Sequence, residues 1–97
     1  MSAYVVFIKE EVTDQSELDA YSQKVGSSFE GRDLKFLATY GALETLEGEP
    51  IQGAVILEFP DMEAARTWYG SAEYQAAAAH RFRGAKYRGF ILESREP

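Results

Sequence analysis

The chain of 97 residues contains no cysteine and a single histidine, His80. The lack of cysteine excludes disulfides, thiol nucleophiles, zinc knuckles and iron–sulfur clusters. One histidine cannot form a multi-histidine metal site, and the acidic residues do not cluster at the spacing of metal ligands. We therefore expect no metal and no other cofactor.

Several other signals are also missing. No apolar run approaches the ~20 residues that cross a bilayer, and MSAYVVFIKE at the start has neither a basic stretch nor a cleavage site. There is no glycine-rich phosphate loop and no G-x-S-x-G elbow. The net charge of −6 opposes binding to nucleic acid or to an anionic membrane. These absences predict a cytoplasmic protein that binds neither nucleic acid nor membranes.

The residues that are present are typical of a small globular domain. Hydrophobic residues make up 45% of the chain, with six tyrosines, six phenylalanines and one tryptophan, which is too apolar for a disordered chain. A chain of this length has room for one core, so we expect residues 1–97 to form a single domain.

Apolar periodicity and turn residues predict the element order βαββαβ. The expected strands span 3–9, 34–46, 52–59 and 86–94, and the expected helices span 13–32 and 61–82. Gly41 predicts a bulge or bend in the second strand. Gly70 and Ser71 interrupt the second helix, and Ser71 caps the segment that follows. Asp14 caps the first helix, with Glu17 in the position of a capping box.

This order is that of a ferredoxin-like α+β fold, a four-stranded antiparallel sheet with two helices on one face. YVVFI and AVILEF are apolar at both alternating sets of positions, so both faces of the sheet need burial. Two helices cover only one face. The other would expose roughly 320 Å² of sheet, comparable with the ~300–600 Å² of the largest patch on a typical monomer. A second copy packed face to face is the simplest cover, so we expect a homodimer.

Three stretches, FLATYGALETLEGEP, AVILEFPDMEAARTWYGSAEYQAA and RGFILES, resemble a bacterial family known as domain of unknown function 1330, in the dimeric α+β-barrel superfamily. The resemblance extends over nearly the whole chain and implies a dimeric barrel with a cavity between sheet and helices in each subunit. It implies no particular reaction, because relatives in the superfamily include cofactor-independent monooxygenases, isomerases, haem-degrading enzymes and ligand-sensing domains. Tyr40 and His80 stand where the family more often has a smaller and an aliphatic residue.

Arg81 and His80 stand near the end of the second helix, in EYQAAAAHRFRGAKYR. At about 100° per residue, Arg81 falls on the inward side with Tyr74, whereas His80 falls about 120° away. We expect Arg81 to hold a negative group in the cavity, or to form an ion pair between helix and sheet. We expect His80 to lie at the helix end outside the cavity, with proton transfer as the alternative.

Glu58 is the expected acceptor for Arg81. It either pairs with Arg81 inside the cavity, where it orients a ligand or acts as a general base, or lies at a solvated strand end. Tyr40, Trp68 and Tyr69 are expected to line the cavity walls, or else to belong to the core.

Three functions are consistent with these residues. The leading hypothesis is a dimeric protein that binds a small anionic organic molecule in a cavity of each subunit. The first alternative is a cofactor-independent isomerase, lyase or monooxygenase that uses Glu58 or His80 for proton transfer. The second alternative is a dimeric interaction scaffold without a ligand.

Overall fold

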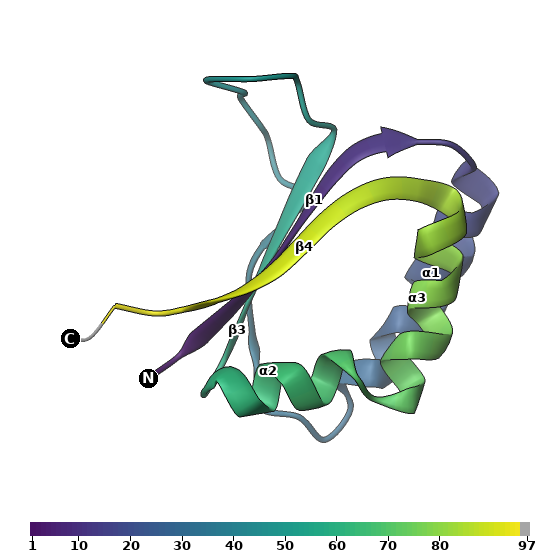
Figure 1. The fold of residues 1–97 in the computed structure, drawn as a ribbon. Coiled ribbons are helices and arrows are strands. Elements are labelled where there is room, and N and C mark those ends of the chain that lie inside the picture. The colour runs from purple at the N-terminus through teal and green to yellow at the C-terminus, as the bar shows by residue number, and fades with distance from the viewer. Residues whose placement is uncertain (96–97) are drawn as a thin grey trace.

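The computed structural model describes residues 1–95 and contains one four-stranded antiparallel sheet with helices packed on one face (Figure 1). The strands are β1 (Ala3–Val12), β2 (Lys35–Thr39), β3 (Gly53–Phe59) and β4 (Ala85–Glu93), in the order β2-β3-β1-β4. The helices are α1 (Gln15–Lys24), the short 3₁₀ helix η1 (Val25–Phe29), α2 (Met62–Tyr69) and α3 (Ala72–Gly84). This confirms the ferredoxin-like α+β fold, with three α-helices rather than two because the second expected helix is divided.

Side-chain caps explain where the helices begin. Asp14 accepts a hydrogen bond from the Ser16 backbone at the start of α1. The Ser71 hydroxyl accepts one from the Tyr74 backbone, 3.2 Å away, at the start of α3. These bonds satisfy backbone N–H groups that have no partner inside the helix. Ser71 therefore divides the second helix as predicted.

β2 is shorter than the sequence predicts. The strand ends at Thr39, and Tyr40 follows with a φ of 52°, in the left-handed region that residues other than glycine rarely adopt. The chain leaves the sheet at this point, so the expectation that the strand continues to residue 46 is wrong. The irregularity in the pairing lies between Phe36 and Ala38, not at Gly41.

The core lies between the sheet and the helices. Alternate residues of β1 and β3 face the helices, among them Phe7 and Leu57, and they pack against Trp68 and Tyr74. Trp68 has no exposed surface, and its indole N–H donates to the Ser28 hydroxyl at 3.1 Å. The aromatic side chains thus form the main contact between the two layers.

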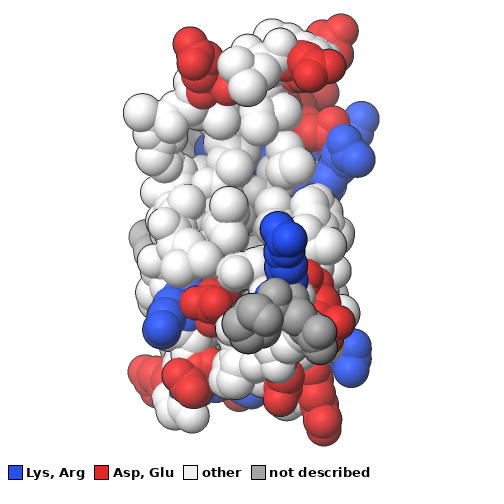
Figure 2. All heavy atoms as spheres, turned by 90° about the vertical axis from the view of Figure 1, so that its left-hand side faces the viewer, with Lys and Arg blue, Asp and Glu red and all other residues white. Residues whose placement is uncertain are grey.

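The opposite side of the sheet, which we call the open face, carries the other alternate residues. Its apolar members are Tyr4, Val6, Ile8, Ala54, Ile56, Phe90 and Leu92, and the charged residues Glu58 and Arg88 lie near its two ends. Figure 2 shows that the centre of this side of the molecule is largely uncharged, with most charged side chains toward its two ends. Among residues 1–95 no helix covers the open face (Figure 1). The prediction that both faces of the sheet are apolar is confirmed.

Candidate functional site

Arg81, on the inner side of α3, lies between two cavities. The larger has a volume of about 510 Å³ and lies between the sheet and the helices; we call it the Arg81 pocket. Its walls include Phe7, Tyr69, Arg81, Phe82, Lys86 and Tyr87. The smaller cavity, of about 100 Å³, lies on the side toward β2 and shares Phe7 and Arg81 with the larger one.

The arrangement of α3 explains why an arginine is buried here. The buried residues of this helix lie on one side and are Tyr74, Ala77, Ala78, Arg81 and Gly84. The small alanine side chains let the helix approach its neighbours closely, and the same helical spacing turns Arg81 inward. The side chain is 4% exposed, so the prediction that Arg81 points inward is confirmed.

The guanidinium of Arg81 is surrounded by aromatic rings. Its central carbon lies 4.7 Å from the ring centre of Phe7, 4.8 Å from that of Tyr87 and 4.9 Å from that of Phe82. The faces of such rings attract a cation. The Nε atom is buried and has no hydrogen-bond partner, and the ion pairs among residues 1–95 do not include Arg81. Its positive charge therefore faces rings and a cavity rather than a carboxylate.

Two tyrosine pairs stand beside Arg81. The hydroxyls of Tyr21 and Tyr74 lie 3.1 Å apart, and those of Tyr40 and Tyr87 lie 2.6 Å apart. Burial raises the pKa of Tyr21, Tyr74 and Tyr87 above the ordinary value of 10.0. These phenols stay neutral at physiological pH, so they do not balance the charge of Arg81.

The aromatic residues that the sequence singles out are divided between the two cavities. Tyr69 lines the Arg81 pocket, whereas Tyr40 and Trp68 line the smaller cavity. The Tyr40 ring lies against the bare backbone of Gly53, where an added Cβ would be 2.7 Å from the ring carbon Cδ1. The ammonium of Lys9 lies 4.8 Å from the centre of the same ring. Tyr40 is therefore held in place despite its left-handed backbone.

Glu58 does not meet Arg81, and the predicted pair between them is wrong. Side chains alternate along β3, and the buried residues Leu57 and Phe59 face the helices. Glu58 points to the opposite side, opposite Tyr4 in the register, and borders a separate pocket. The sequence places Glu58 on one strand face correctly, but that face is the one away from the Arg81 pocket.

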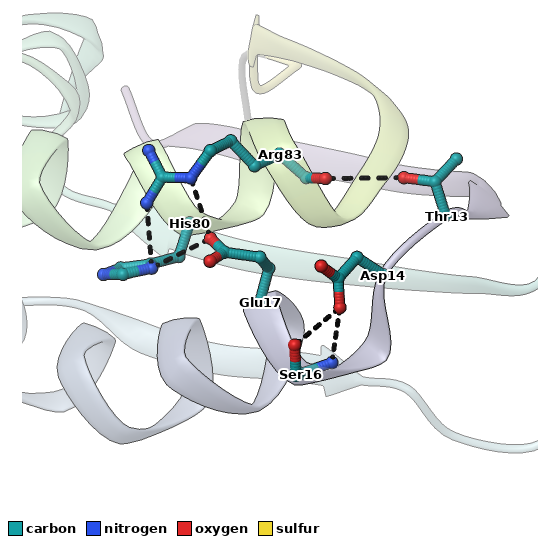
Figure 3. A network of polar contacts seen from close by, with 6 residues as sticks. All are labelled: Thr13, Asp14, Ser16, Glu17, His80 and Arg83. Atoms are coloured by element: carbon teal, nitrogen blue, oxygen red, sulfur yellow. Dashed lines mark hydrogen bonds and ion pairs between the residues drawn. The ribbon is translucent and has the colours of Figure 1, made fainter.

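His80 belongs to a polar cluster between α1 and α3, shown in Figure 3. Its Nδ1 lies 3.0 Å from Oε2 of Glu17, which also accepts a hydrogen bond of 2.9 Å from Nε of Arg83. The hydrogen bond with His80, followed by that with Arg83, lowers the pKa of Glu17. His80 lines neither cavity, as predicted. Glu17 joins the two helices instead of completing the expected capping box.

Sequence reasoning missed Phe7 and Phe82 as walls of the Arg81 pocket. Phe7 shares a strand face with Val5, but alternation alone does not tell which face meets the helices. Gly89 is a further signal, because an added Cβ there would lie 2.8 Å from the Phe7 ring. A glycine opposite a phenylalanine leaves room for the ring at the edge of the pocket.

Within residues 1–95, no group of three or more histidine, aspartate or glutamate side chains is placed to hold a metal ion. No helix of that part of the chain is long and apolar enough to cross a membrane. The polar groups that line the Arg81 pocket are one guanidinium, one ammonium and tyrosine hydroxyls.

Comparison with known proteins relates the chain to a family and to a fold. The sequence model of the family described as domain of unknown function (DUF1330) matches residues 2–94. None of the curated proteins matches the chain. A protein of unknown function from Rhodopseudomonas palustris has a similar structure, with 18% identity and a TM-score of 0.76 over 99% of this chain and 84% of that one.

Two further solved structures share the fold at lower identity. One is a dimeric protein of unknown function with a ferredoxin-like fold from Bacteroides fragilis, with 12% identity, a TM-score of 0.63 and coverage of 96% of both chains. The other is SnoaB, a cofactor-independent oxygenase from Streptomyces nogalater, with 10% identity, a TM-score of 0.61 and coverage of 99% and 95%. At these identities the similarity shows the fold alone.

Proposed function

The chain belongs to the family of domain of unknown function DUF1330, and we propose that it binds a small anionic organic molecule in the Arg81 pocket of each subunit of a homodimer. The proposal rests chiefly on one observation, the buried guanidinium of Arg81 that faces a cavity without a carboxylate partner. A buried charge without a partner is costly, and a bound anion would supply that partner.

The size and the charge of the pocket support the same proposal. Its volume of about 510 Å³ lies in the range of sites for small organic molecules, roughly 300–1,000 Å³. Arg81 and Lys86 both line it, and no acidic residue among residues 1–95 does, although the chain as a whole carries a net charge of −6. A local excess of positive charge in an acidic protein favours an anionic ligand.

Thermal unfolding in the presence of aromatic and short-chain organic acids at millimolar concentration tests ligand binding. Binding to the folded state alone raises the melting temperature, by an amount that grows with ligand concentration. The rise should disappear in Arg81→Met and persist in Arg66→Met, which removes an exposed positive charge on α2. If none of the acids raises the melting temperature of the wild-type protein, the proposal fails.

The homodimer is proposed because of the open face. Phe90 and Leu92 on this face are 45% and 56% exposed. The similar protein from Bacteroides fragilis is described as dimeric. A second copy packed on this face would remove a contiguous apolar surface from water.

Sedimentation over a wide range of protein concentration tests the dimer. Val6 lies at the centre of the open face, between Ile56 and Phe90, so Val6→Lys should produce a folded monomer. The matched variant Thr67→Lys adds the same charge at an exposed position on α2 and should leave the dimer intact. A monomer mass for the wild-type protein at every concentration would contradict the proposal.

The two alternative functions receive less support from the geometry. Glu58 and His80, the candidate groups for proton transfer, both lie outside the Arg81 pocket, so neither can exchange a proton with a ligand bound beside Arg81. A scaffold without a ligand would not need a pocket of about 510 Å³ beside a buried charge.

A further inference from the structure

We infer, as an extension that rests on the proposed function, that the ligand is an aromatic weak acid, a phenol or an enol, which the Arg81 pocket binds as its anion. The pocket would then make the bound molecule a stronger acid than it is in water. Three features of the described residues support this class of ligand: the aromatic walls, the geometry of access to the guanidinium, and the neutrality of the groups around it.

The walls favour a flat, apolar body. Five aromatic side chains contribute to the lining, and they come from the sheet and from the helices α2 and α3: Phe7, Tyr69, Phe82, Tyr87 and Phe90. Aromatic rings pack well against other rings in stacked or edge-on arrangements, which add to the effect of burying apolar area. A planar conjugated ligand can use several of these surfaces at once.

Access to Arg81 favours a ligand with one delocalised negative oxygen. A carboxylate pairs best with an arginine through two parallel N–H groups. Here Nε is buried, which closes the side-on edge of the guanidinium and leaves a carboxylate only the end-on edge formed by the two Nη atoms. Three rings also lie within 4.9 Å of the central carbon. A phenolate or enolate needs only one donor. Because its charge extends into an apolar ring, it also loses less hydration on burial than a carboxylate does.

The titratable groups around the pocket leave the positive charge of Arg81 uncompensated. They come from the elements packed against it and are Lys9 of β1, Tyr21 of α1, Tyr40 after β2, Tyr69 of α2, Tyr74 of α3, and Lys86 and Tyr87 of β4. Burial raises the pKa of Tyr21, Tyr74 and Tyr87, so these groups do not supply a negative charge. An uncompensated positive charge favours the ionised form of a neighbouring acid and lowers its pKa. The proton leaves to solvent, and no covalent step is involved.

The test uses 4-nitrophenol, whose anion absorbs visible light, as the probe for a phenol. Its absorbance is titrated against pH with and without saturating protein, and its affinity is compared with those of benzoate and cyclohexanecarboxylate. We expect the midpoint of ionisation to fall by at least about one pH unit, which corresponds to at least about tenfold tighter binding of the anion than of the neutral phenol. We also expect the phenolate to bind at least about tenfold more tightly than either carboxylate.

Variants connect the shift to Arg81. In Arg81→Met the midpoint should return to its value in water, and in Arg66→Met the shift should remain. If the neutral phenol binds as tightly as its anion, or if either carboxylate binds as tightly as the phenolate, the inferred ligand class is wrong while anion binding in the pocket still stands. If neither the phenol nor the carboxylates bind the wild-type protein, the proposed function itself is wrong. The measurements on the wild-type protein decide between these outcomes even if Arg81→Met does not fold.

Discussion

Replacing Arg81 with methionine tests whether this arginine stabilises the fold or is kept for a ligand. Methionine is long, flexible and apolar, so it fills most of the same volume without a charge. In the folded protein it would lie among the same rings of Phe7, Phe82 and Tyr87 that now surround the guanidinium.

The expected change in the free energy of unfolding is small because two large effects oppose each other. Three rings lie within 4.9 Å of the guanidinium carbon, and cation–π contacts in a desolvated site contribute about 1–2 kcal/mol each, or about 3–6 kcal/mol together. Against this, a buried charge left without a partner costs about 3–5 kcal/mol. The two ranges largely cancel, so we expect Arg81→Met to change the free energy of unfolding by no more than about 3 kcal/mol in either direction.

Urea unfolding followed by circular dichroism measures this change, with ligand binding assayed on the same samples. Leu57→Ala serves as a reference, because truncating this buried leucine should cost about 2–5 kcal/mol. Arg81→Met should lose the ligand while it keeps its stability. A loss of more than about 3 kcal/mol, in the upper range expected for Leu57→Ala, would refute the reasoning, because it would mean that the fold itself compensates the charge.

Three further predictions concern contacts outside the Arg81 pocket, made by Glu17, Ser28 and Gly53. Because the hydrogen bond with His80 lowers the pKa of Glu17 below its ordinary 4.5, Glu17→Gln should destabilise the protein above that pH and have little effect well below it. Equal losses in urea unfolding at about pH 7 and about pH 3 would contradict this. Ser28→Ala leaves the buried tryptophan N–H without its partner and should cost about 1–3 kcal/mol in the same assay; no measurable loss would show that the bond contributes nothing. Gly53→Ala places a Cβ 2.7 Å from the Tyr40 ring and should cost about 1–3 kcal/mol. Adding Tyr40→Ala should recover much of this loss, whereas simple additivity would show that the two sites are independent.

Helical and strand periodicity differ in what they reveal about the site. Within α3 the angle between residues follows from the helix itself, and the apolar side is marked by Tyr74 and the alanines, so the inward Arg81 and the outward His80 were predictable. In β3 a period of two separates Glu58 from Leu57, but both sets of positions are apolar enough to be buried. Nothing in the strand alone identifies the side that the helices cover, and the expected pair of Glu58 with Arg81 failed for that reason.

The end of β2 shows a second limit of sequence reasoning. Tyr40 adopts a left-handed backbone because its ring rests on Gly53 and its hydroxyl meets that of Tyr87. Residues of three separate segments make these contacts, so no local pattern around residue 40 announces them. Gly41, which does look like a bend in the sequence, lies beyond the end of the strand.

The amino-acid sequence by itself determined the order of the strands and helices, the capped helix starts and the presence of apolar residues on both sides of the sheet. These properties depend on backbone preferences and on periodicity over a few neighbouring residues. Only the tertiary structure decided which side of the sheet the helices cover, that Arg81 has no acidic partner among residues 1–95, and that two cavities adjoin it. Those properties arise where surfaces from distant segments meet, and which side chains come into contact there depends on how all the segments pack together.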